Sequence, residues 1–200
     1  MNIPIFPLGT VLFPGGRLPL RVFETRYMDM VRNCMRNGTP FGICRITAGN
    51  EVGKPADHES VGCLARISDW DMKDIGVLRI TVIGSERFKV QQRTIAADGL
   101  INASIDLIAD DPLEPVPEQY AGCAALLKQV VADIEQKTTQ AEERPITPPY
   151  RFDSSAWVGN RLCELLSIPA SAKQKLMELD EPAVRLSLID QYLKQRQVIR

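Results

Sequence analysis

The sequence is poor in the residues that build metal sites and disulfide frameworks. It has one histidine, His58, and five cysteines, and no two cysteines are spaced as a Cys-x-x-Cys pair. A typical zinc site needs several imidazole or thiolate ligands, and a disulfide framework normally uses an even number of cysteines. We therefore expect no metal site, and we expect the cysteines to be small buried apolar residues in a reducing compartment.

Long apolar runs and a strong charge bias are also missing. No apolar stretch approaches the ~20 residues that cross a bilayer, and the N-terminus lacks the basic and apolar segments of a secretory signal. The formal net charge of -1 offers no bulk attraction to nucleic acid or to an anionic membrane. We therefore expect a cytoplasmic protein with no membrane contact.

The first 60 residues predict short strands and one helix. Prolines and glycines break residues 2–22 into short extended pieces. Apolar residues at helical spacing then predict a helix over residues 24–37, which ends at Asn37-Gly38. Residues 41–46 read as a strand, and the polar residues 48–60 are predicted to form a mobile loop.

Three alternating strands follow, each with one apolar side. Their apolar residues are Val61, Cys63, Ala65 and Ile67, then Leu78, Ile80, Val82, Phe88 and Val90, then Ile101, Ala103, Ile105 and Leu107. This alternation is typical of a half-buried antiparallel sheet. The second strand is long and is expected to bend at Gly84, which suggests a small closed or nearly closed barrel.

The pattern changes to helical spacing beyond a proline-rich boundary near Pro112. We expect a helix from about residue 120 to 140, a second one capped by Ser154 or Ser155, and a short helix over residues 171–179. A final helix is predicted to start from Asp180 as its N-cap. Its expected buried residues are Val184, Leu188, Ile189, Tyr192 and Leu193. The predicted domains are therefore a β-domain, residues 1–112, and a helical part, residues 113–200.

Two motifs near the N-terminus resemble a known family. They are the turn Leu12-Phe13-Pro14-Gly15 and the corner Phe23-Glu24-Thr25-Arg26-Tyr27. Together they are similar to the start of the Lon N-terminal domain, the substrate-recognition domain of the Lon ATP-dependent proteases, with Thr25 in place of the usual proline. Residues 62–67, 83–90 and 166–178 are similar to later segments of that domain. The resemblance implies an α+β fold: a PUA-like antiparallel β-barrel (the pseudouridine-synthase-and-archaeosine-like type) with one inserted helix, followed by a helical domain.

No catalytic site is expected. The sequence has no Gly-x-x-x-x-Gly-Lys-Ser/Thr loop for phosphates, and nothing in it resembles the serine–lysine setting of the Lon protease domain. It resembles a stand-alone Lon N-domain protein, so neither ATP hydrolysis nor proteolysis is implied. His58 is interpreted as an exposed loop histidine, and the acidic turn at Asp69, Asp71 and Asp74 as solvated. We therefore predict a protein that is not an enzyme and that has no cofactor.

The leading hypothesis is a module that recognises unfolded or partner polypeptide, as the resemblance implies. The first 25 residues contain more apolar side chains than a short segment interrupted by prolines usually buries. We therefore predict that some of Leu12, Phe13 and Arg26 line an exposed polypeptide-binding patch. The corner itself, Phe23, Glu24, Arg26 and Tyr27, is interpreted as a strand-to-helix turn with a surface ion pair or a cap. Because Arg26 lies two residues after Glu24, its side chain is expected to project in a different direction.

Two alternatives stay open. Related barrels bind RNA, and the arginines between Arg17 and Arg45 could follow a phosphate backbone, although the near-neutral charge and the lack of exposed aromatic and lysine clusters disfavour this. The chain could instead be a structural adaptor or homodimer that docks through its C-terminal amphipathic helices.

Overall fold

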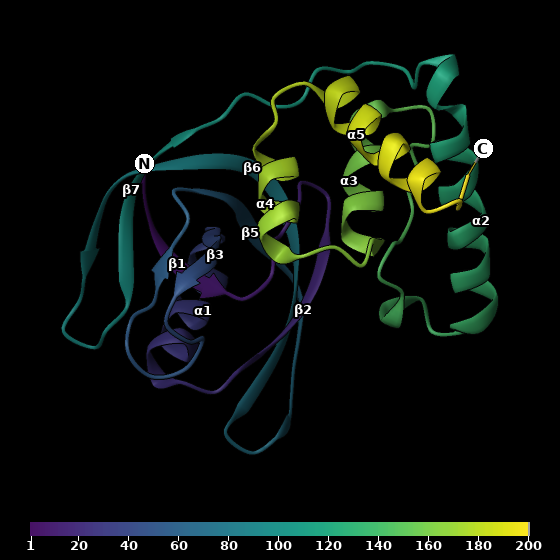
Figure 1. The fold of residues 1–200 in the computed structure, drawn as a ribbon. Helices are drawn as coiled ribbons and strands as arrows, with labels where there is room; N and C mark the ends of the chain where they lie inside the picture. The colour runs from purple at the N-terminus through teal and green to yellow at the C-terminus, as the bar shows by residue number, and fades with distance from the viewer. Residues whose placement is uncertain (200) are drawn as a thin grey trace. The chain divides into compact units, whose positions relative to one another are not determined.

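The described residues form seven strands with one inserted helix, followed by further helices. The structure, a computed structural model, describes residues 1–199, apart from the side chains at positions 73 and 142. The first part holds β1 (Asn2–Leu8), β2 (Arg17–Val22), α1 (Thr25–Asn37), β3 (Phe41–Ala48), β4 (Asp57–His58), β5 (Val61–Asp74), β6 (Val77–Ile95) and β7 (Ile101–Leu107) (Figure 1). A mostly antiparallel sheet with one inserted helix, followed by a helical part, confirms the predicted α+β class.

The later elements are helical. They are the single turn η1 (Glu118–Tyr120), α2 (Ala121–Lys137), the single turn η2 (Ala141–Glu143), α3 (Ser155–Leu165), α4 (Ala170–Glu178) and α5 (Pro182–Gln195). Residue contacts divide the chain into one compact unit over Met1–Asp110 and a second unit from Asp111 onward. The domain limits of 1–112 and 113–200 stay a prediction.

The strand pairings run from β1 through β7, β6 and β5 to β3, and β3 pairs with β1 in turn. β2 pairs with β6, and the short β4 pairs with β3. All pairings are antiparallel except β1 with β3, where Ile5 lies opposite Gly42. That parallel pair was not expected from alternation alone, and it arises because the chain crosses over through β2 and α1 before it returns as β3.

The helix α1 covers one part of the sheet with an apolar face. Its buried residues include Tyr27, Met30, Val31 and Cys34, which join a core that β1, β3, β5 and β6 also line. Met35, near the end of the helix, is 36% exposed. The helix ends as predicted at Gly38, whose φ of 64° is the left-handed conformation that favours glycine at a helix C-terminus.

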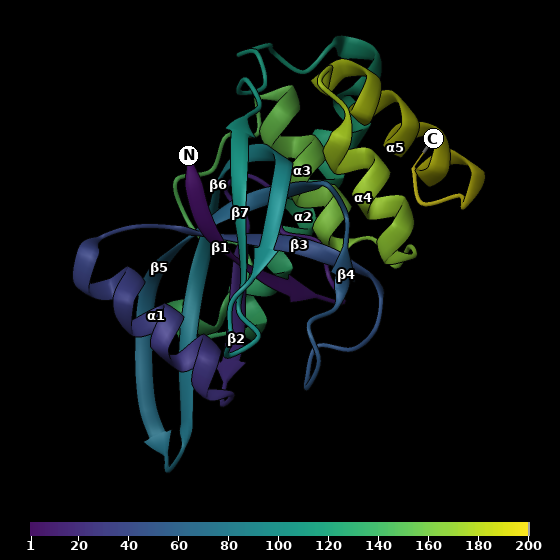
Figure 2. The same cartoon turned by 90° about the vertical axis from the view of Figure 1, so that its left-hand side faces the viewer.

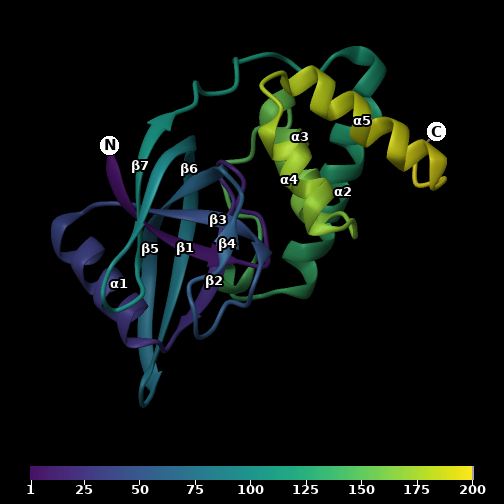
Figure 3. The same ribbon diagram turned by 60° about the vertical axis from the view of Figure 1, so that its left-hand side comes forward.

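The β5–β6 hairpin is long and reaches past the rest of the sheet, as Figures 2 and 3 show. Gly84 lies within β6, where the sequence predicted a bend. Its backbone exchanges hydrogen bonds with the turn after β1: Gly15 N–H donates to Gly84 O at 2.8 Å, and Gly84 N–H donates to Gly16 O at 2.8 Å. A side-chain methyl at this position would overlap the Phe13 carbonyl, so close backbone approach is what requires glycine.

The second unit is built mainly from α2, α3 and α5, which contact one another. Ser154 is the N-cap of α3, as one of the two predicted candidates, and its hydroxyl accepts a hydrogen bond from Trp157 N–H at 3.3 Å. The prediction for α5 was one residue early, since its N-cap is Glu181 and Pro182 is the first helical residue. Within the described residues, no helix is both long and apolar enough to cross a bilayer.

The predicted buried face of α5 was partly wrong. Ile189 and Leu193 are buried, but Val184 and Leu188 are 41% and 46% exposed. Arg185 is buried instead, because its guanidinium pairs with the Asp111 carboxylate at 2.6 Å and also donates to the carbonyls of Leu176 and Leu179. A fully paired arginine can therefore take a core position that sequence patterning assigns to an apolar residue.

Candidate functional site

The chain turns from strand to helix at the Phe23–Tyr27 corner. Glu24 is the N-cap of α1 and has an extended backbone, with φ −74° and ψ 132°. Its carboxylate does not cap the helix but pairs with Arg26 at 3.0 Å and accepts a hydrogen bond from Gly53 N–H at 3.2 Å. The expectation that Arg26 points away from Glu24 is wrong, because Glu24 is not yet helical and helical spacing does not apply to it.

Arg26 joins the start of α1 to the turn between β6 and β7. The side chain is 6% exposed, and its Nη1 donates to Gly99 O at 3.0 Å. Its guanidinium also lies 4.6 Å from the centre of the Tyr27 ring, at the distance of a cation–π contact. The predicted surface ion pair is thus a largely buried one, and it holds three segments of the chain together.

Tyr27 and Phe23 have opposite environments. Tyr27 is 3% exposed and stacks on Phe6 with 4.2 Å between the ring centres. Burial is the main cause of the raised pKa of its phenol. Phe23 is 51% exposed. Of the four corner residues, Phe23 is therefore the one that offers apolar surface to a partner.

The predicted exposed patch around the Leu12-Phe13 turn is not present. Leu12 is 3% exposed and Phe13 is fully buried, so this expectation is wrong for both residues. They are covered because Gly15 and Gly16 pin the turn against Gly84 of β6, which folds both side chains inward. Arg26 is also largely buried, and it lines the polar hollow described below.

An apolar hollow of about 320 Å³ lies beside the corner. The residues that line it are Phe6, Leu8, Pro19, Leu20, Arg21, Val22, Phe23, Glu24, Tyr27, Glu51 and Val52. Phe23 and Val52, which is 54% exposed, present the most open apolar side chains in this set. An apolar concave surface with a few polar groups at its edge is the usual form of a binding site.

A second, more polar hollow shares Phe23 and Glu24 with the first. It is also lined by Arg26, Asp29, Gly53 and Asp98, so acidic side chains outnumber basic ones. This excess of acidic groups would repel the phosphate groups of a nucleic acid. We refer to the two hollows together as the corner site. Neither was visible in the sequence, because Val52 and Asp98 come from loops far from the corner in the chain.

The residues considered for catalysis have other roles. Burial raises the pKa of the Cys123 and Cys163 thiols to about 12, which disfavours the reactive thiolate. All five cysteines are buried and free, as predicted. Among the described residues, no group of three or more His, Cys, Asp or Glu could hold a metal ion.

His58 and the acidic turn can also be placed. His58 is half-buried in β4 and not in an exposed loop, because its Nδ1 lies 2.7 Å from Glu59 O. Burial is the main cause of its lowered pKa. In the acidic turn, Asp74 pairs with Arg79 at 2.5 Å, which lowers the pKa of its carboxyl. The mobility predicted for residues 48–60 stays a prediction.

Comparisons with known proteins point to one family. The family model for the ATP-dependent protease La (LON) substrate-binding domain matches residues 2–195. Among curated proteins, a Lon protease from Anaeromyxobacter dehalogenans is 26% identical over 98% of this chain and 23% of its own length. Protein cereblon from Danio rerio is 23% identical over 75% of this chain and 33% of its own length. The chain thus spans a third or less of these two relatives.

Solved structures give the same result. A Lon N-terminal domain protein from Xanthomonas campestris has a TM-score of 0.77 and 31% identity, and the match covers 94% of this chain and 96% of that one. The N-terminal domain of a Lon protease from the Mycobacterium avium complex has a TM-score of 0.63 and 13% identity. That match covers 97% of this chain and 98% of the other, and at this identity it shows a shared fold alone.

Proposed function

Because this chain belongs to the family of the ATP-dependent protease La (LON) substrate-binding domain, we propose that it is a non-catalytic module that binds polypeptide through the corner site. The single observation that carries this proposal is the half-exposed Phe23, which stands on the wall shared by both hollows. Phe23 and the equally exposed Val52 form a contiguous apolar surface on the hollow, and such surfaces commonly mark binding sites.

The chemistry of the corner site favours unfolded or partner polypeptide over RNA. Phe23 and Val52 would cover apolar client side chains, and Glu24, Asp29 and Asp98 would tolerate basic ones. The free and buried cysteines support the further proposal that the protein acts in a reducing, cytoplasmic setting. The absence of catalysis is part of the proposal, and it is supported by cysteine thiols that disfavour ionisation.

Fluorescence anisotropy tests the proposed function. Labelled, carboxymethylated α-lactalbumin, which stays unfolded, and a labelled single-stranded RNA are titrated separately with the purified protein at low and high salt. We expect saturable, salt-tolerant binding of the polypeptide, since apolar contacts dominate, and no comparable binding of the RNA. Salt-sensitive RNA binding without polypeptide binding would overturn the proposal.

A pair of variants locates the interaction. Phe23→Ser should weaken polypeptide binding by about tenfold, because it removes a large apolar contact. Leu113→Ser is the matched control, since Leu113 is 89% exposed but lines neither hollow. Equal affinities for the wild-type protein and the Phe23 variant would place the binding surface elsewhere.

A further inference from the structure

The edge of β5 is open over residues 66–70. On one side β5 pairs with β6 along the hairpin. On the other side it pairs with β3 only from Cys63 to Ala65, and in the described part of the chain no strand continues that pairing beyond Ala65. Backbone N–H and C=O groups on an open edge can pair with another extended chain.

An irregularity at Ser68 changes which side chains of β5 face the core. Ile67 lies opposite Val82 and Trp70 lies opposite Ile80, with a register shift between Ile67 and Asp69. Residues opposite one another in a pair of strands point to the same face. Ile67 and Trp70 therefore share the face of Val82 and Ile80, although two residues, Ser68 and Asp69, lie between them.

The apolar face of the hairpin is covered along β6 but open along β5. Val82 and Ile80 are 0% and 2% exposed, whereas Trp70 on the same face is 55% exposed. A strand added beside β5 would extend this face and could cover the indole. The exposed Trp70 is thus the observation that marks an incomplete edge of the sheet.

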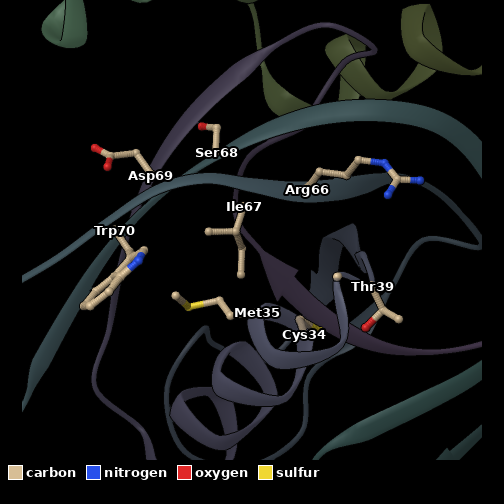
Figure 4. Close-up of a pocket in the computed structure, with 9 residues that line it drawn as sticks. Cys34, Met35, Thr39, Arg66, Ile67, Ser68, Asp69 and Trp70 are labelled. Carbon is tan, nitrogen blue, oxygen red and sulfur yellow. The ribbon is translucent and has the colours of Figure 1, made fainter.

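A hollow of about 360 Å³ runs beside this edge (Figure 4). Five consecutive residues of β5, from Arg66 to Trp70, line it, together with Cys34 and Met35 of α1 and with Gly38 and Thr39 just after that helix. Ile67 and Trp70 lie on one face of the strand and Asp69, opposite Thr81, lies on the other, so a hollow that all three line follows the edge of the strand. In Figure 4, Ile67 points toward Met35, and Trp70 closes the same apolar end.

We propose that an extended polypeptide segment with apolar side chains adds as a strand to the open edge of β5 and seats those side chains against Met35, Ile67 and Trp70. This inference rests on the proposed function, since it names how and where a polypeptide client binds. Main-chain hydrogen bonds would supply affinity without fixing the client sequence, and the apolar end would select alternate side chains of the client. Such a mode suits clients that share extended, apolar character and no single sequence.

The two surfaces lie at opposite ends of α1. The corner site is at the start of the helix and the β5 edge is at its end. The helix has 13 residues, which corresponds to a length of about 20 Å. About six residues of extended chain span that distance, so one unfolded segment is long enough to engage both surfaces.

N-methylated peptides test strand addition directly. The probe is a labelled nine-residue peptide of alternating valine and threonine with lysine at each end. Two further peptides carry N-methyl groups on the odd or on the even amides, which removes hydrogen-bond donors from one edge at a time. We expect one N-methylated peptide to bind at least about tenfold more weakly than the parent, because several hydrogen bonds are lost, and the other to bind like the parent.

Protein variants test the location. Trp70→Lys places a charge in the hollow and should weaken binding of the parent peptide by about tenfold. Ile75→Lys is the matched control, since Ile75 lies on the same hairpin, is fully exposed and does not line the hollow. In a Trp157→Phe background, Trp70 is the one remaining tryptophan, and its emission should shift to shorter wavelength when the peptide covers it.

The remaining outcomes decide between strand addition at β5, polypeptide binding elsewhere and self-association. Equal binding of all three peptides, or unchanged binding by Trp70→Lys, overturns strand addition at β5. If α-lactalbumin binds but the peptide does not, the inference fails and the proposed function stands. If neither binds, both fail. If the wild-type protein self-associates in light scattering, Trp70→Lys abolishes this and the peptide does not bind, the occupant is a second copy of the chain and the proposal is overturned.

Discussion

Glu24 and Arg26 are separated by one residue in the chain, and their side chains form an ion pair of 3.0 Å at the start of α1. The pair sits between the loop at Gly53 and the turn at Gly99, with which it makes two further hydrogen bonds. The corner that carries Phe23 is therefore held by polar contacts from two distant segments, which fixes the position of an exposed aromatic ring.

Replacing Arg26 tests this support. Arg26→Met removes the ion pair and the bond to Gly99, so we expect the free energy of unfolding in urea to fall by about 2 kcal/mol. Arg32→Met is the control, because Arg32 and Asp29 form an ion pair whose side chains are 66% and 54% exposed. That pair should contribute at most about 0.5 kcal/mol. Equal losses in the two variants would show that Arg26 does not hold the corner.

Two glycine-to-alanine substitutions should change the stability of the protein in opposite directions. Gly84→Ala forces a methyl group into the Phe13 carbonyl and should destabilise the protein by about 1–3 kcal/mol. Gly122→Ala in α2 meets only Ile199 at 3.7 Å and should stabilise it by about 0.5–1 kcal/mol, since alanine favours helix. The midpoint temperature of thermal unfolding should fall for Gly84→Ala and rise for Gly122→Ala. A stabilising Gly84→Ala would mean that the turn after β1 is not pinned to β6.

Loss of one partner of the buried ion pair between Arg185 and Asp111 should destabilise the protein much more than loss of one partner of a surface ion pair. Arg185→Met leaves the Asp111 carboxylate, whose side chain is 8% exposed, without its guanidinium partner. We expect a loss of about 3–5 kcal/mol in unfolding free energy. Lys175→Met removes an ion pair with Glu178 in which the lysine is 73% exposed, and it should cost at most about 0.5 kcal/mol. Similar chemical denaturation curves for the two variants would contradict this assignment.

Glu164 should make stability depend on pH. Burial raises the pKa of its carboxyl to about 7, against the lowering influence of Arg161 at 2.7 Å and of Lys173. In the unfolded chain the pKa is about 4.3. The folded protein therefore binds the proton more tightly than the unfolded chain does. This contribution to stability is fully present below about pH 4.3 and is lost as the pH rises through 7. The unfolding free energy falls by at most about 1.4 kcal/mol per pH unit over this range.

Glu164→Gln removes that titration. Relative to this variant, the wild-type protein should lose unfolding free energy between pH 5 and pH 8, as measured by urea denaturation at each pH. A difference between the two proteins that stays constant over this range would show that the Glu164 carboxyl titrates alike in the folded and unfolded chains.

Local patterns in the sequence were sufficient for most of the fold. The helix ending at Gly38, the alternating strands and the Ser154 cap all follow from short-range chemistry, and the structure has each of them. The parallel pairing of β1 with β3 could not be predicted in this way, because it depends on where a crossover returns. Burial of Arg185 depends likewise on a partner, Asp111, that is 74 residues away.

The candidate surfaces were harder to predict. Leu12 and Phe13 looked available because the segment around them is short and rich in proline and glycine, but a contact with Gly84 folds them inward. Trp70 was overlooked because strict alternation would place Ile67 and Trp70 on different faces of β5. The register shift at Ser68 brings both side chains to the same face. Val52 reaches the corner site through a loop whose path has no sequence signal.

The most direct test of the central claim is the anisotropy titration of carboxymethylated α-lactalbumin with the wild-type protein and the Phe23→Ser variant at two salt concentrations. We predict saturable binding that tolerates salt and that weakens by about tenfold in the variant, since an exposed apolar ring carries the contact. Absence of polypeptide binding, together with RNA binding that falls steeply with salt, would contradict the account.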